Sequence, residues 1–203
     1  MSHRNDAETQ RILSVVSAFR RTVIVSETIH VVSGMHIVVR QTVAMDVHAV
    51  SAILTEAASW LEDRGIPLWK IDDVSVEQLR GDVTSGLFAL GEANGTAAGT
   101  LKYQLHDSVF WPDVPDGESA FVHRVAVRCD YAGGVVSGAL LKWAVDRTRA
   151  MGLPYLRLDC DASRSKLRAV YERFGFRYHS DKRVGPYHVS RYEYAVAENA
   201  CPK

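Results

Sequence analysis

A run of small residues between positions 131 and 141 has the composition of a phosphate-binding turn. Gly133, Gly134 and Gly138 lie between a predicted strand and a predicted helix. Glycines let backbone N–H groups approach a phosphate closely, and the helix N-terminus adds about half a positive charge. A pyrophosphate could therefore bind here without a lysine. Close packing of the helix on the sheet explains the same glycines equally well, so both interpretations stand at this point.

Side chains near this segment have the chemistry to move protons. His123 titrates near neutral pH, and strict alternation along its strand places it on the face of Val125 and Val127. Glu118, in the loop before that strand, and Asp159, on a later strand, are further candidate proton acceptors. A structural, hydrogen-bonded histidine is the alternative for His123. Capping or pairing with a neighbouring arginine is the alternative for Asp159.

The elements that must position these groups follow from the hydrophobic pattern. Residues 36–40 predict a strand, and apolar residues at helical spacing predict a helix over 47–61. Ser75 with Gln78 has the spacing of a capping box at the start of a second helix. The full predicted order is strand, two helices, three strands, helix, strand, helix, two strands. This order predicts a mixed α/β sheet, in which an antiparallel meander leads through a crossover helix to a parallel neighbour.

Two segments together resemble the GNAT superfamily of N-acetyltransferases. One is the strand Val125-Ala126-Val127 with the small-residue loop and helix that follow it. The other is the helix end Tyr171-Glu172-Arg173-Phe174-Gly175-Phe176. The resemblance covers about residues 36–196 and is closest over 121–176. It implies a GNAT-like acyl-CoA N-acyltransferase fold, with a central mixed sheet flanked by helices.

The resemblance also implies an activity, which is transfer of an acetyl group from acetyl-CoA to a primary amine by direct attack in a ternary complex. Tyr171 would donate a proton to the departing thiolate. The alternative is that Tyr171 only packs in the core, since it lies on an apolar helix face. His123 would be the base, with Glu118 as a second candidate. The implied cofactor-binding residues are Val125, Ala126, Val127, Ala132, Gly133, Gly134, Val135, Val136, Ser137 and Gly138.

Several positions depart from the family pattern. Ala132 stands where the loop of the family begins with Arg or Gln, and Val135 stands at a family glycine. A β-branched residue disfavours positive φ and fills space where a phosphate would approach. Gly134 and Gly138 would compensate by shifting the flexible points by one residue. These departures motivate an alternative function, a catalytically weak or inactive CoA-binding sensor of the same fold, and a longer acyl-CoA is a third possibility.

The acceptor amine has fewer sequence signals. Aromatic side chains commonly form the walls of small-molecule sites, and Trp69 and Trp111 both fall in predicted loops. We therefore predict that these two tryptophans contact the acceptor, against the alternative that they belong to the core. A polyamine, an amino acid, an aminoglycoside and a protein N-terminus all fit as acceptors, and a homodimer is compatible with the family.

Composition excludes several other classes. The 24 Lys and Arg residues balance 24 Asp and Glu residues, so the strong basic surplus of a nucleic-acid binder is missing. No apolar run reaches the roughly 18 residues that a membrane-spanning helix needs. Three cysteines without a C-x-x-C pair, and eight histidines without H-x-x-x-H spacing, predict no disulfide framework and no metal. The expected setting is reducing and cytoplasmic.

The first 34 residues stand apart from this pattern. We predict an N-terminal extension over 1–34 and the GNAT-like domain over 35–203. The extension is either without a role of its own or an added element that covers a sheet edge or a dimer surface.

Overall fold

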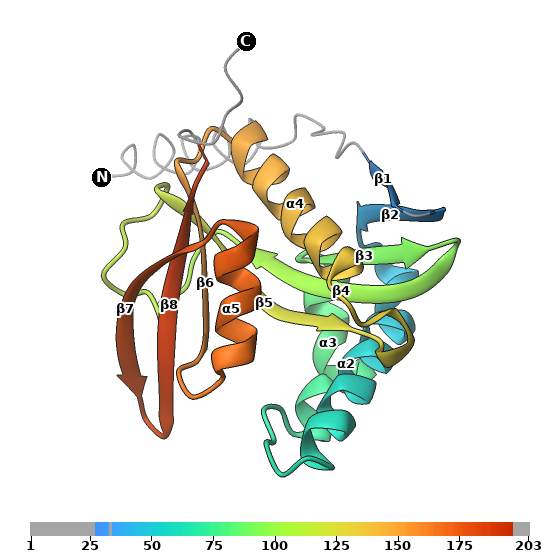
Figure 1. The fold of residues 1–203 in the computed structure, drawn as a ribbon, viewed down its shortest axis with the longest axis horizontal. Coiled ribbons are helices and arrows are strands. Elements are labelled where there is room, and N and C mark those ends of the chain that lie inside the picture. Colours follow the sequence, from blue (N-terminus) through green and yellow to red (C-terminus); the bar gives the residue numbers. More distant parts are fainter. Residues whose placement is uncertain (1–26, 33, 197–203) are drawn as a thin grey trace, which may run out of the picture.

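The computed structural model describes residues 27–32 and 34–196, which form an eight-stranded mixed sheet with helices on both faces (Figure 1). The strands are β1 (Thr28–Val32), β2 (Met35–Gln41), β3 (Phe88–Ala93), β4 (Thr96–Gln104), β5 (Ser119–Val127), β6 (Tyr155–Asp161), β7 (Arg177–Val184) and β8 (Tyr187–Ala195). The α-helices are α2 (Val47–Glu62), α3 (Val76–Thr84), α4 (Val135–Ala150) and α5 (Ser165–Phe174). Short 3₁₀ helices are η1 (Ala44–Asp46), η2 (Ile71–Val74) and η3 (Cys129–Tyr131).

The predicted fold class and the order of elements from β2 onward are confirmed. The strands lie in the order β1-β2-β3-β4-β5-β6-β8-β7, and among them only β5 and β6 run parallel. β1 pairs antiparallel with β2 at one edge of the sheet, so residues 28–32 of the predicted extension take part in the sheet. Residues 1–26 lie outside the described part of the chain. None of the helices that the structure describes is long and apolar enough to cross a membrane.

The parallel pairing of β5 with β6 ends early. It runs from Ser119 opposite Tyr155 to Val122 opposite Leu158. Beyond that point β5 continues to Val127 beside β4, whereas β6 continues to Asp161 beside β8. Figure 1 shows the two strands diverging, with β5 heading toward the α2 side while β6 stays with β8. The sheet is therefore opened in its middle, immediately after the last β5–β6 pair.

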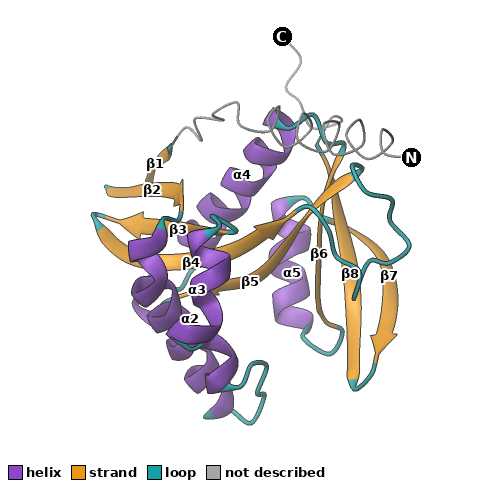
Figure 2. Cartoon of the chain, turned by 180° about the vertical axis from the view of Figure 1, so that it is seen from behind, coloured by secondary structure: helices purple, strands orange, loops and turns teal. Residues whose placement is uncertain are grey.

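Two apolar cores hold the helices on opposite faces of the sheet. α4 packs on one face through buried residues that include Leu140 and Trp143, and α5 lies on the same face (Figure 1). α2 and α3 cover the other face through residues that include Leu54 and Leu79, as the view from behind shows (Figure 2). The apolar positions at helical spacing that predicted the helix over 47–61 supply this second core.

The helix ends follow local chemistry. The Ser75 hydroxyl accepts a hydrogen bond from the Gln78 backbone N–H at 3.4 Å, which confirms the predicted cap of α3. Gly134 precedes α4 with φ 97°, and Gly175 ends α5 with φ 116°. Both values lie in the left-handed region, which glycine enters without steric cost.

Close contact between α4 and β4 makes Gly99 sensitive to substitution. A Cβ atom at Gly99 would lie 2.9 Å from Val136 Cγ1 and 3.0 Å from the Ala126 carbonyl oxygen. We expect Gly99→Ala to lower the free energy of unfolding by about 1–3 kcal/mol, because the helix must shift away from the sheet. Urea unfolding followed by circular dichroism measures this change.

Gly81→Ala is the matched control, because Gly81 lies within α3 and a Cβ atom there would meet nothing within 4 Å. It should raise the free energy of unfolding by about 0.5–1 kcal/mol through helix propensity. Equal effects of the two alanines would contradict the close contact of α4 with the sheet.

Candidate active site

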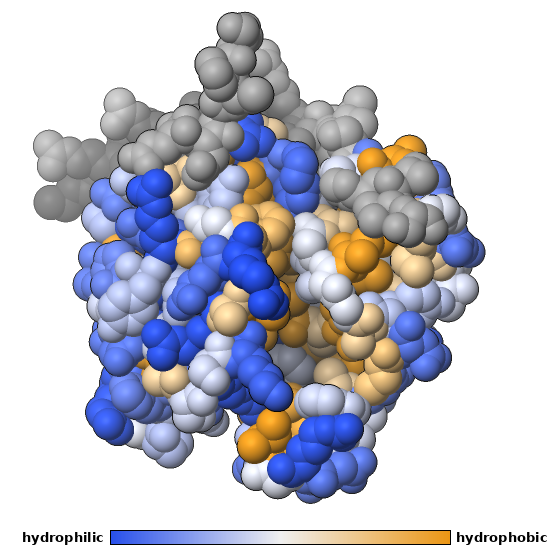
Figure 3. Space-filling model, in the orientation of Figure 1, coloured by the Kyte–Doolittle hydropathy of each residue, from blue (hydrophilic) through white to orange (hydrophobic). Residues whose placement is uncertain are grey.

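A cavity of about 820 Å³ lies on the face of the sheet that carries α4 and α5. Its walls come from the end of β5, from the first turns of α4 and from one side of α5. Figure 3 shows apolar residues gathered around a hollow on this face of the molecule. The lining residues are Val125, Val127, Gly133, Gly134, Val135, Ser137, Gly138, Leu141, Leu167, Val170, Tyr171, Arg173 and Phe174.

Most of the residues that the sequence nominated for a cofactor line this cavity, namely Val125, Val127, Gly133, Gly134, Val135, Ser137 and Gly138. The other three nominated residues do not line it. Ala126 is buried against the α2 and α3 core, Val136 is buried in the core beneath α4, and Ala132 is exposed.

The loop before α4 has the backbone conformation that its altered sequence requires. The positive φ angles fall on Gly133 and Gly134, at 131° and 97°, and Val135 is the first residue of the helix. The first hydrogen bond of the helix runs from Gly138 N–H to the Gly134 carbonyl, so the N–H groups of residues 135–137 have no partner within the helix. Val135 and Ser137 line the cavity at this start of the helix, and Arg173 lines it from the last turn of α5.

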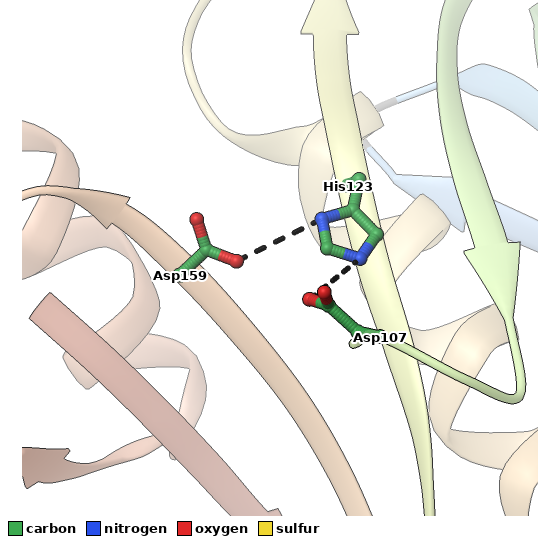
Figure 4. Close-up of side chains that lie close together, drawn as sticks. All are labelled: Asp107, His123 and Asp159. Carbon is green, nitrogen blue, oxygen red and sulfur yellow. Dashed lines mark ion pairs between the residues drawn. The ribbon is translucent and has the colours of Figure 1, made fainter. Parts of the chain in front are cut away.

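A polar cluster lies where β5 and β6 diverge. His123 and Asp159 directly follow the last paired residues of their strands, and Asp107 reaches the same point from the loop after β4 (Figure 4). His123 Nε2 lies 3.4 Å from Asp107 Oδ2, and His123 Nδ1 lies 3.7 Å from Asp159 Oδ1. The side chains of Asp107, Asp159 and His123 are only 4%, 10% and 18% exposed.

This cluster faces away from the cavity because β5 contains a bulge. Arg124 has φ 51°, and the register against β4 shifts at the same place. Before the bulge Val122 packs toward α4, and after it Val125 and Val127 do so. The expectation that His123 shares the face of Val125 and Val127 was therefore wrong, since strict alternation breaks at one extra residue.

Neighbouring side chains identify the face on which His123 lies. The partner of His123 on β4 is Lys102, which forms an ion pair with Asp82 of α3. Arg124 donates a hydrogen bond to the Asp73 carbonyl in η2. His123 is thus on the α2 and α3 side of the opening, opposite the cavity.

Burial sets the protonation of the cluster. It lowers the pKa of His123 to about 4, although the negative charge of Asp107 acts in the opposite direction. Burial, and then the charge of Asp107, raise the pKa of Asp159 to about 7. His123 is therefore a neutral imidazole at neutral pH, able to accept a proton, and Asp159 is poised between its neutral and ionised forms.

Tyr171 lies on the cavity side of the opening. Its side chain is 6% exposed and contacts the rings of Phe176 and Tyr192. Burial, followed by the charges of Cys160 and Asp159, raises the pKa of its phenol above the usual value. Burial likewise raises the pKa of the nearby Cys160 thiol to about 12. Both groups keep their protons at neutral pH.

The remaining nominated residues lie elsewhere. Glu118 is exposed in the loop before β5 and has no side-chain contact with the cluster among the described residues. Trp111 is 1% exposed and is stacked among Phe121, Arg157 and Arg191, which is the packing alternative. Trp69 is half-buried and packs against the α2 and α3 core.

Asp107 was missed by the sequence interpretation. It sits in a loop without a motif, and only the fold carries it to His123. Its Oδ1 atom accepts hydrogen bonds from the N–H groups of Val109 and Phe110, at 3.0 and 2.9 Å. An aspartate whose carboxylate accepts from the N–H groups two and three residues later forms a common local turn. This pattern carries no information on function.

The same three side chains are the group of possible metal ligands in the described part of the chain. Asp107, His123 and Asp159 each offer an atom within 4.8 Å of the others. The two carboxylates, however, face different nitrogens of one imidazole ring (Figure 4). A metal ion binds a single imidazole nitrogen, so this arrangement suits proton transfer better than convergence on an ion.

Comparison with known proteins places this geometry in context. Residues 51–176 match the family model described as the acetyltransferase (GNAT) family. The Bacillus subtilis protein named uncharacterized N-acetyltransferase YesJ is 27% identical over 139 residues, which are 66% of this chain and 77% of that protein.

Solved structures show the same fold. An acetyltransferase of the GNAT family from Listeria monocytogenes has a TM-score of 0.69 and 23% identity, covering 83% of this chain and 99% of its own. The PaiA N-acetyltransferase from Thermoplasma acidophilum, solved in complex with coenzyme A, has a TM-score of 0.63 and 18% identity, covering 78% of this chain and 99% of its own.

The lowered pKa of His123 is directly measurable. Ring ¹⁵N signals of His123, identified by their loss in His123→Gln, should remain those of a neutral imidazole from about pH 8 down to about pH 5. The reason is that burial penalises the imidazolium. A titration with a midpoint near the ordinary value of about 6.5 would contradict the environment described here.

Proposed function

The chain belongs to the acetyltransferase (GNAT) family, and we propose that it moves the acetyl group of acetyl-CoA to a primary amine by direct attack in a ternary complex. The observation that carries the proposal is the opening between β5 and β6. It lies between a cavity on one face of the sheet and a buried histidine on the other. An acyl group bound on the cavity side can thus meet an amine that arrives from the opposite side.

The cofactor fits the cavity in its chemistry. The N–H groups of residues 135–137 and the dipole of α4 would hold the pyrophosphate, and Arg173 would supply a positive charge from the α5 wall of the cavity. Val125 and Val127 would flank the pantetheine, whose amides can bond to the β5 edge that β6 leaves unpaired. The bound coenzyme A of the Thermoplasma acidophilum relative supports this assignment.

The reaction needs one base and one acid, on opposite sides of the reacting carbon. The amine nitrogen attacks the thioester carbonyl carbon, and the new C–N bond forms as the amine proton passes to neutral His123. The C–S bond then breaks, and the sulfur takes the proton of the Tyr171 hydroxyl. The products are the amide and CoA thiol, and solvent restores the two side chains.

Cys160 indicates why Tyr171 can protonate the leaving sulfur. In water a thiolate is less basic than a phenolate, so the transfer would be unfavourable. Next to Tyr171, however, burial raises the pKa of the Cys160 thiol to about 12, so an anionic sulfur in these surroundings is strongly basic. Desolvation of the CoA thiolate would likewise raise its basicity, which favours proton transfer from Tyr171.

Binding of the cofactor can be tested at the start of α4. Acetyl-CoA should bind to the wild-type chain in isothermal calorimetry. Ser137→Glu should weaken binding at least about tenfold, because its carboxylate would repel the pyrophosphate. Ser137→Gln, of the same size and without charge, is the matched control and should bind more nearly like the wild type. Equal affinities of the two variants would contradict a pyrophosphate at this helix.

The acid role of Tyr171 has its own test. Tyr171→Phe should lower kcat by about 10²-fold while the affinity for acetyl-CoA is retained, since only the proton donor is removed. Release of CoA thiol from acetyl-CoA, with a panel of primary amines, measures the rate. Tyr187→Phe, which removes an exposed hydroxyl at the β7–β8 turn, is the control and should leave kcat unchanged.

The panel also separates the enzyme from the alternative function. Turnover with any amine of the panel supports the transferase. Tight binding of acetyl-CoA without turnover on polyamines, amino acids, aminoglycosides and peptide N-termini would support a CoA sensor instead. An unchanged rate in Tyr171→Phe would remove that side chain from the mechanism.

A further inference from the structure

The cations around the buried carboxylate of Asp159 are already committed to other partners. Arg191 is the residue opposite Asp159 on β8, yet it donates hydrogen bonds to Ser180 Oγ, the Phe110 carbonyl and Asp113 Oδ1. Lys102 is paired with Asp82. Asp159 Oδ1 is buried without a hydrogen-bond partner among the described residues. A nine-tenths buried carboxylate with an unsatisfied oxygen calls for a donor, and a cationic donor satisfies it best.

The spacing between Asp159 and His123 suits one ammonium group that donates a hydrogen bond to each side chain. Their nearest atoms, Oδ1 and Nδ1, are 3.7 Å apart, which is too long for a hydrogen bond between them. At tetrahedral angles, N···acceptor contacts of about 2.8 Å place two acceptors about 4.6 Å apart, and acceptors 3.7 Å apart bend each hydrogen bond by only about 13°. One ammonium nitrogen can therefore donate to both atoms, with little movement of either side chain.

Asp107 decides which nitrogen of His123 is free. Two backbone N–H groups fix its Oδ1 atom, and its Oδ2 atom faces His123 Nε2 at 3.4 Å. Both atoms are buried without a hydrogen-bond partner among the described residues, so a small rotation of the ring would let Nε2–H donate to Oδ2. Because Asp107 is clamped, closer to the ring and more buried than Asp159, it is the better acceptor of the single N–H of a neutral imidazole. Nδ1, which faces Asp159, is then left with its lone pair.

We propose that Asp159 anchors the ammonium group of the acceptor and that Asp107 is a positioning residue that keeps Nδ1 of His123 free to deprotonate it. This inference rests on the proposed acetyl transfer and names the class of its acceptor: an aliphatic primary amine that is cationic at neutral pH. The ammonium donates one N–H to Asp159 Oδ1 and another to His123 Nδ1. His123 takes the second proton and releases it to solvent. The neutral amine then attacks, and its surplus proton passes to His123, which is neutral again, as the C–N bond forms.

Binding of a simple probe tests the anchor without turnover. The full chain, saturated with CoA, is titrated with n-butylamine and with the neutral isostere 1-butanol at pH 8. We expect butylammonium to bind at least about tenfold more tightly than butanol, because only the cation completes the charge-assisted contact. Asp159→Asn should abolish this preference. The preference for the cation should survive in Asp161→Asn, which removes an equal charge two residues away on β6.

The pH dependence supplies a second readout. The groups that face Asp159 are His123 on β5, Asp107 in the loop after β4 and Arg191 on β8, with Cys160 and Tyr171 also coupled to its charge. Burial raises the pKa of Asp159 to about 7 and lowers the pKa of His123 to about 4, so His123 is neutral over this pH range. Butylammonium binding should therefore strengthen as pH rises from about 6 to about 8, where the carboxylate forms. This change should be missing in Asp159→Asn.

Asp107→Asn tests the positioning role. Its amide oxygen can still accept from Val109 and Phe110, but its NH₂ group would donate to His123 Nε2 and force the proton onto Nδ1. We expect ring ¹⁵N signals of His123 to change from the Nε2–H to the Nδ1–H tautomer. With an amine that turns over, kcat should fall by about 10²-fold or more, with little change in acetyl-CoA affinity.

Three results would overturn the inference: equal binding of butylamine and butanol, an undiminished preference in Asp159→Asn, or an unchanged tautomer in Asp107→Asn. Failure of the proposed function looks different. A chain that binds CoA and prefers butylammonium through Asp159, but releases no CoA thiol from acetyl-CoA with any amine, would retain the anchor and lose the transferase.

Discussion

The short parallel pairing between β5 and β6 is the constraint on which the rest of the site depends. Parallel strands that separate leave a gap lined by backbone groups of one strand and by the first side chains beyond the last pair. Here those side chains are His123 and Asp159. Had pairing continued, backbone hydrogen bonds would join β5 to β6 between the cavity face and the polar cluster. The bulge at Arg124 completes this arrangement, because it turns Val125 and Val127 toward the cavity while His123 stays on the other face.

Desolvation gives the groups around the opening their proton affinities. The same burial lowers the pKa of His123, raises that of Asp159 and raises those of Tyr171 and Cys160. In each case the charged form is the one that loses water. In the proposed mechanism, the neutral form of His123 as base and the protonated form of Tyr171 as acid would both follow from one apolar environment.

The loop over residues 105–118 links the far edge of the sheet to this chemistry. Arg191 on β8 holds the loop through Asp113 and the Phe110 carbonyl, and it stacks on the buried Trp111. The loop in turn presents Asp107 to His123. The hydrogen bond from Arg191 keeps the pKa of Asp113 low, at about 2. Arg191 acts on Asp159 through its charge, but the structure gives no hydrogen bond from it to Asp159 among the described residues. The contacts of Arg191 with the loop thus explain both the ion pair with Asp113 and the missing hydrogen bond to Asp159 among the described residues.

The sequence by itself determined the order of elements from β2 onward, the glycine loop before α4 and the family resemblance, because these depend on local periodicity, turn chemistry and short motifs. It also predicted His123 and Tyr171 as proton-transfer residues. Of the ten residues predicted to bind the cofactor, seven line the cavity. The tertiary structure alone decided the rest. A single extra residue at Arg124 reversed the face of His123, which no pattern of alternation reveals. A long loop places Asp107 beside His123. Trp111 lies in the core, and Glu118 lies on the surface. Contacts between residues distant in sequence depend on strand register and loop packing, and neither of these can be predicted from the local sequence pattern.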